Sequence, residues 1–142
     1  MKKIGHFLLA VFLLMALVGG ISCQSKTAQY TTATPEGTIR LYLNAQCQLD
    51  AEKVAQCFVK EAREKARTDA EQGFKQIYSF SVEKVKIKVV SQTDDTAKVE
   101  VRCDKIVSPL WSKGEYRDVY KDQVNEFDLV KQDGEWLIKA PK

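Results

Sequence analysis

Residues 97–104 read AKVEVRCD, and in this stretch small or apolar residues alternate strictly with charged ones. A period of two is the pattern of a β-strand that buries one face and exposes the other to solvent. Asp104 falls on the charged face, where we expect an ordinary solvated carboxylate. The predicted core face consists of Ala97, Val99, Val101 and Cys103.

The preceding segment repeats this alternation and predicts a neighbouring strand. Residues 84–89 read KVKIKV, so a row of lysines faces solvent while the branched residues face the core. Phe80 and Val82 have the opposite parity, which places a bulge or a strand boundary near Glu83. If the two strands pair, Glu100 and Asp104 neutralise the lysine row, and the lysines then form the solvent-exposed face of a sheet.

The C-terminal segment predicts a hairpin. Residues 127–138 read FDLVKQDGEWLI, in which apolar residues at the start alternate with acids. Asp133-Gly134 is the dipeptide that favours a two-residue turn between strands. Pro109 interrupts the preceding strand, and a loop follows it over 110–114. The second half of the chain is therefore predicted to be an antiparallel meander.

The first half of the domain carries helix signals instead. Residues 34–36 read TPE, which supplies a capping threonine, a proline for the first turn and an acid at the positive end of the helix dipole. This helix is predicted to run to about Ala45, and Asp50 caps a second one. Residues 59–72, with alanines four apart, predict a third helix or a continuation of the second, which Gly73 ends. Helices followed by a meander predict an α+β fold, with two to three N-terminal helices packed on a curved, mostly antiparallel four-stranded sheet.

The segment 1–22 has the pattern of an export signal. Two lysines precede an unbroken apolar run over 7–18, and small or slim residues follow it. A membrane-spanning helix needs about 20 apolar residues, so a permanent transmembrane anchor is the less favoured alternative.

Residues 20–23 read GISC and resemble a bacterial lipobox, with Gly20 standing where leucine is usual. The resemblance implies that cleavage leaves Cys23 first and that its thiol carries diacylglycerol. The alternative is ordinary signal cleavage with Cys23 as a spare thiol. We expect a lipid-anchored protein at the outer membrane or cell surface of a bacterium, with a flexible tether over 23–33 and a single domain over 34–142.

Removal of the signal changes the composition in two ways. The signal takes with it two of the 22 basic residues and no acid, so the mature chain has 20 minus 19, or +1. That balance gives no case for nucleic-acid binding. The single histidine, His6, also belongs to the signal, which removes the commonest general base and metal ligand. We expect no metal and no cofactor.

Three further cysteines remain, and export to an oxidising space permits one disulfide among them. Cys57 lies on the apolar face of a predicted helix and Cys103 on the core face of a predicted strand. A disulfide between these two is slightly preferred. A bridge between Cys47 and Cys57 would need the chain to fold back, and a set of buried free thiols is nearly as well supported.

Taken together, the helix starts at 34–36 and Asp50, the charged segment 59–72 and the final hairpin 127–138 resemble the nuclear transport factor 2-like superfamily, in particular its small exported lipoproteins. The resemblance covers residues 34–139 and implies a cone in which the helices close over a bent sheet, with a pocket at the wide end. It also implies relatives among isomerases, dehydratases and polyketide cyclases, whose chemistry uses a carboxylate base. No position here matches those catalytic residues, because neither Asp104 nor Asp128 lies on a core phase.

Four aromatic residues are candidates for a pocket or an interface, although we favour sheet packing for those near the long hairpin loop. They are Tyr42, Trp111, Tyr116 and Tyr120. The leading hypothesis is a non-enzymatic lipoprotein whose pocket or sheet binds an envelope protein or a small apolar ligand. The alternative is a small isomerase or dehydratase, with Asp118 or Asp122 as its carboxylate.

Overall fold

The computed structural model describes residues 30–140, so the predicted export segment, Cys23 and most of the predicted tether lie outside it. The elements follow in chain order as α1 (Pro35–Cys47), α2 (Ala51–Gln56), the 3₁₀ turn η1 (Lys60–Ala62), α3 (Arg63–Phe74), β1 (Ile77–Gln92), β2 (Thr96–Pro109), the 3₁₀ turn η2 (Leu110–Ser112), β3 (Asp118–Gln132) and β4 (Glu135–Ile138).

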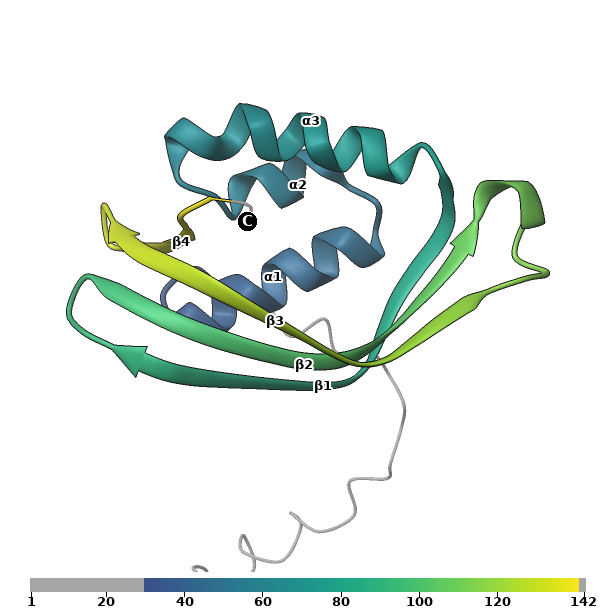
Figure 1. The fold of residues 1–142 in the computed structure, drawn as a ribbon. Coiled ribbons are helices and arrows are strands. Elements are labelled where there is room, and N and C mark those ends of the chain that lie inside the picture. Colours follow the sequence, from purple (N-terminus) through teal and green to yellow (C-terminus); the bar gives the residue numbers. More distant parts are fainter. Residues whose placement is uncertain (1–29, 141–142) are drawn as a thin grey trace, which may run out of the picture.

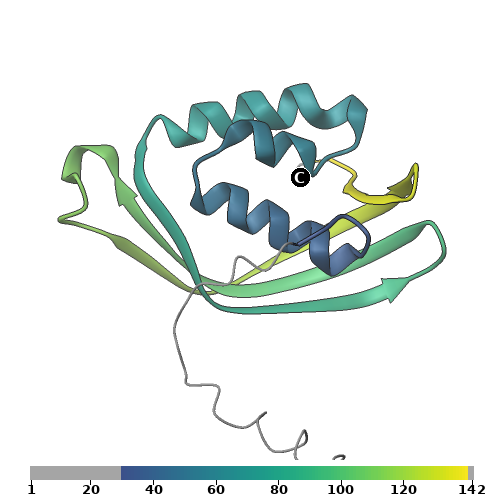
Figure 2. The same ribbon diagram turned by 180° about the vertical axis from the view of Figure 1, so that it is seen from behind.

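The strands form one antiparallel sheet in the order β1-β2-β3-β4. The sheet curls around the three helices, and the β2–β3 end with η2 projects beyond them in both views (Figure 1, Figure 2). This arrangement confirms the predicted α+β fold. The predicted turn is also confirmed, because Asp133 and Gly134 have φ values of 51° and 83° and connect the paired residues Gln132 and Glu135.

The helix starts agree with the predicted caps. Thr34 Oγ1 accepts the Gly37 N–H at 3.0 Å, and Asp50 Oδ1 accepts the Lys53 N–H at 3.0 Å. The predicted stop at Gly73 is wrong, since α3 continues to Phe74 and ends on Lys75 in a right-handed conformation that needs no glycine.

The sheet bends where two bulges flank the middle of β2. Lys84 in β1 and Asp122 in β3 have φ values of 52° and 50°, and the pairing register shifts beside each of them. The shift in β1 confirms the irregularity predicted near Glu83.

Asp104 lies on β2 between these bulges and is only 6% exposed, so the prediction of a solvated carboxylate is wrong. Its Oδ1 accepts the Asp122 N–H at 2.9 Å, and its Oδ2 lies 2.8 Å from Lys84 Nζ. The hydrogen bond from Lys84, followed by that from the Asp122 amide, holds the pKa of Asp104 below its usual value. Simple alternation missed this position because the extra residues lie in the neighbouring strands, where the Lys84 side chain and the Asp122 N–H reach a carboxylate that β2 alone would leave exposed.

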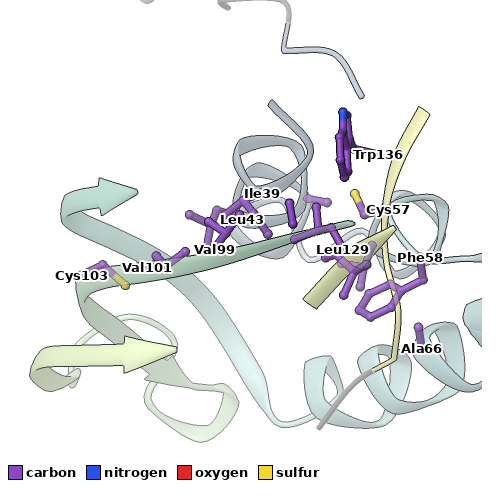
Figure 3. Packing of buried hydrophobic residues seen from close by; sticks show 14 residues of the cluster. Ile39, Leu43, Cys57, Phe58, Ala66, Val99, Val101, Cys103, Leu129 and Trp136 are labelled. Atoms are coloured by element: carbon purple, nitrogen blue, oxygen red, sulfur yellow. The ribbon is translucent and has the colours of Figure 1, made fainter. Parts of the chain in front are cut away.

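The core fills the space between the helices and the concave face of the sheet (Figure 3). Ile39, Val99 and Leu129 come from α1, β2 and β3 and are at most 1% exposed. The short strand β4 joins the two layers, because Ile138 donates its N–H to Cys57 O at 2.8 Å and accepts the Val59 N–H at 2.9 Å. Helices and sheet therefore form one packed unit.

Candidate functional site

A cavity of about 270 Å³ lies between the three helices and the start of β1. Most of its wall is apolar or aromatic, and its polar side chains come from α1 and α3. The lining residues are Tyr42, Gln46, Val54, Phe58, Ala66, Asp69, Ala70, Gly73, Phe74, Ile77 and Phe80.

Tyr42 is the polar centre of this cavity. Its ring makes edge-to-face contacts with Phe58 and Phe127, at centroid distances of 5.8 and 5.4 Å. Its hydroxyl oxygen accepts a hydrogen bond of 2.9 Å from Gln46 Nε2, so the phenolic proton can be donated to a ligand. Burial raises the pKa of Tyr42 to about 12, which keeps the phenol neutral across the physiological range.

A second cavity of about 470 Å³ lies on the β3 side of the same aromatic pair. Tyr42 and Phe58 line both cavities, so the two spaces adjoin at this aromatic pair. The second space is more polar, because Asn125, Glu126 and Asp128 contribute to its wall. The apolar space beside α3 is therefore better suited to an uncharged guest.

The carboxylate at the first cavity is Asp69 of α3, which the sequence analysis did not single out. Asp69 is exposed and pairs with Lys65 Nζ at 2.5 Å, which places it at the rim. A signal was present in the sequence: Asp69 follows Ala66 by three residues and precedes Ala70, on the predicted alanine face. An acid at a helical position like this one lies outside the strand alternation on which the predicted core phase was based.

The structure separates the four predicted aromatic residues. Tyr42 lines the cavity, whereas Trp111, Tyr116 and Tyr120 lie at the far end of the β2–β3 hairpin. There they are 75%, 49% and 49% exposed, which contradicts the interpretation as sheet packing. Packing fails because the helices do not reach this end of the sheet (Figure 1).

The two predicted catalytic acids also lie at this end of the sheet, away from the cavities. Asp118 accepts the hydroxyl of Tyr116 at 2.7 Å, and Asp122 is exposed at the β3 bulge. Neither residue lines the two cavities described above. Asp69 is therefore the carboxylate to consider for chemistry in the first cavity.

The predicted Cys57–Cys103 pair is not joined, and both residues are free thiols. Figure 3 shows them at opposite ends of the core cluster, Cys57 beside β4 and Cys103 at the bend of β2. The Cys57 thiol instead lies 3.4 Å from Lys53 O, and burial raises its pKa to about 12. Burial also raises the pKa of Cys47, as does the charge of nearby Cys103 to a smaller extent.

Within residues 30–140 there is no group of three or more histidine, cysteine or acidic side chains that could hold a metal ion. No helix of that range is long and apolar enough to cross a membrane. What the cavity can do chemically is enclose an apolar molecule and offer it hydrogen bonds from Tyr42 and Gln46.

No protein-family model matches the sequence, and a search of curated proteins finds no match. Solved structures do match. A protein from Novosphingobium aromaticivorans described as an aromatic ring hydroxylase has a TM-score of 0.63 and 12% identity, over 74% of this chain and 81% of that one. A ketosteroid isomerase-like protein from Erwinia carotovora has a TM-score of 0.62 and 16% identity, over 77% and 91%.

A third structure is described as a dehydratase of the nuclear transport factor 2-like family from Streptomyces avermitilis. Its TM-score is 0.54 at 12% identity, over 72% of this chain and 86% of that one. At such identities the likeness shows the fold and carries no activity across. The chain therefore has the fold of the nuclear transport factor 2-like superfamily, a helix-covered cone with a curved antiparallel sheet.

Proposed function

We propose that this chain is a lipid-anchored envelope protein whose cone cavity binds a small apolar molecule without transforming it. The observation that carries the proposal is the cavity beside α3, about 270 Å³ in volume and lined mostly by apolar and aromatic side chains. Ligand sites typically enclose about 300–1,000 Å³, so the guest is small. The export and anchoring part of the proposal rests on the apolar segment and on Cys23 in the sequence.

The polar groups of the cavity favour binding over catalysis. Tyr42 is a neutral phenol, and Gln46 is a neutral amide, so together they recognise a carbonyl or hydroxyl group on an apolar frame. Asp69 is exposed and paired with Lys65, so its carboxylate is held by a cation at the rim rather than enclosed with a guest. The chain also has no histidine after His6.

Filling the cavity tests the binding proposal. The uncharged dye N-phenyl-1-naphthylamine is expected to fluoresce on binding to the protein, and Ala70→Leu is expected to weaken that binding about tenfold or more. Thr68→Leu is the matched control, because it adds the same side chain to an exposed position of α3 outside the cavity lining. Equal dye binding by both variants would contradict the proposed site.

The anchor has its own test, the intact mass of the protein isolated from bacterial membranes. We expect a chain that begins at Cys23 and carries acyl groups, and we expect the acyl mass to be lost in Cys23→Ala. An unmodified chain in the soluble fraction would overturn the anchor and leave the cavity proposal standing.

An isomerase or dehydratase is the second candidate, because Asp69 and Tyr42 line the same cavity. In that case Asp69 removes a proton from a bound carbonyl compound while the neutral phenol donates a hydrogen bond to its oxygen. Proton exchange at the acidic carbon of a bound ketone, followed by NMR in D₂O, distinguishes the two functions. Exchange lost in Asp69→Asn but kept in Asp118→Asn would favour the enzyme.

A further inference from the structure

The end of the β2–β3 hairpin carries large apolar side chains that the rest of the fold leaves uncovered. This hairpin tip consists of Leu110, Trp111, Tyr116, Val119 and Tyr120, each 49–75% exposed. Trp111 and Tyr116 stack on each other, with ring centroids 5.6 Å apart and planes at 21°. Such a group of exposed aromatic residues marks an interaction site.

The hairpin tip has a fixed shape. Ser112 Oγ lies 2.9 Å from Pro109 O and 3.0 Å from Tyr116 O, and its single O–H, donated to one or shared between the two carbonyl oxygens, closes the loop around η2. The Leu110 N–H donates to Gln76 O at 2.9 Å and ties the loop to the segment between α3 and β1. Little ordering is therefore required when the tip meets a partner.

Its apolar side chains lie on both faces of the hairpin. Val119 and Tyr120 are neighbours in β3, so they point to opposite faces, yet 50% and 49% of their surface is exposed. A folded protein partner covers one face of a hairpin, whereas a membrane interface surrounds an inserted tip on all sides. Tryptophan and tyrosine are also the residues enriched at that interface.

The charges of the tip suit a lipid headgroup layer. Lys113, Arg117 and Lys121 stand among the aromatic residues, against two acids, Glu115 and Asp118. Residues 110–121 thus carry a net +1, and Asp122, the next residue, brings the end of the hairpin to neutral, so the segment can meet anionic headgroups without net repulsion.

The position of the tip relative to the predicted anchor also favours contact with a lipid surface. Thr32 O accepts the Trp136 N–H at 2.8 Å, so the described chain begins beside β4, at the other end of the 15-residue strand β3. A straight strand of that length measures about 50 Å at about 3.3 Å per residue, and the bend at the β3 bulge brings its two ends closer than that. The seven peptide steps from Cys23 to Tyr30 add at most about 25 Å, which lets both ends of the domain meet one surface.

We propose that the hairpin tip inserts into the headgroup layer of a lipid bilayer and acts as a second membrane contact, which lays the domain lengthwise on the surface. The inference rests on the proposed envelope location. The membrane contact of the tip is tested in protein that lacks the lipid anchor. A tip that does not bind lipid is therefore distinguishable from a Cys23 that is not acylated.

The experiment uses residues 23–142 with Cys23→Ala, which include every described element, and vesicles of phosphatidylcholine and phosphatidylglycerol at 3:1. We expect the protein to sediment with the vesicles and Trp111→Ala/Tyr116→Ala to partition about tenfold less, equivalent to about 1.4 kcal/mol. Tyr30→Ala is the matched control, an exposed aromatic residue at the other end of the domain. Iodide quenching should report Trp111 alone, because Trp136 is 3% exposed, and vesicles should abolish that quenching.

Three results would overturn the proposal. The first is that the protein with an unaltered tip fails to sediment with vesicles. The second is that Tyr30→Ala reduces partitioning onto vesicles as much as the double variant does. The third is a concentration-dependent dimer that the double variant abolishes, which would make the tip a contact between copies. Thermal unfolding checks the fold of each variant, and an unchanged midpoint is expected because these side chains are exposed.

Discussion

Asp104 shows how one carboxylate holds the bend of the sheet. Its two oxygens accept hydrogen bonds from Lys84 and from the Asp122 amide, the residues at the two bulges. Without these bonds, the Asp122 N–H on the bulged strand would lose its partner. The side chain therefore acts on the shape of the sheet rather than on the chemistry of the cavity.

We expect Asp104→Asn to lower the midpoint of thermal unfolding at pH 7, because the amide loses the charge that binds Lys84. Asp94→Asn, at an exposed turn position, is the control and should leave the midpoint unchanged. The pKa of Asp104 is lowered in the folded state, so its stabilising effect is complete above the unfolded value of about 3.9 and is lost as the pH falls through the folded value. The difference between the unaltered protein and Asp104→Asn should shrink below about pH 4, and a constant difference would contradict this role.

At the scale of elements, the sequence predicted the parts that local patterns determine. The alternation of 97–104 placed Val99 and Val101 in the core, and the caps at Thr34 and Asp50 placed the helix starts. The burial of Asp104 depends on the pairing of three strands, which no single segment contains. The exposed tip depends on how far the helices reach along the sheet, which is likewise a tertiary property.

The residues of the cavity were likewise predictable from the sequence only where a local pattern determines them. Tyr42 falls within the predicted first helix and was among the aromatic candidates for a pocket, so its place in the cone could be anticipated. The alanine face of 59–72 places Asp69 beside Ala66 and Ala70, whereas its position at the rim of a cavity depends on the packing of α3 over α1 and β1.

Two glycines in helices should respond in opposite directions to alanine. A Cβ on Gly37 would overlap the Thr31 carbonyl oxygen, so Gly37→Ala forces a backbone shift at the start of α1 and should cost about 1–3 kcal/mol. Gly73 has no atom within 4 Å of that position, and Gly73→Ala should stabilise α3 by about 0.5–1 kcal/mol. Denaturant unfolding of both variants measures the two effects, and a stabilised Gly37→Ala would show that the entry to α1 is not tightly packed.

For the whole molecule, the cavity and the hairpin tip are separate sites on one rigid frame. No residue of the tip lines either cavity, and the continuous core between helices and sheet occupies the region between them. Sites that share no residues and no mobile element are expected to contribute independently. A ligand in the cone should therefore bind equally well to the free and the membrane-bound protein.

The double variant Ala70→Leu/Trp111→Ala tests this independence. Its dye affinity should equal that of Ala70→Leu, and its partitioning onto vesicles should equal that of Trp111→Ala, each within about twofold. Dye titrations in the presence and absence of vesicles complete the cycle. If vesicles change the dye affinity of the unaltered protein more than threefold, the two sites are coupled, and the bend at Asp104 between them becomes the element to alter first.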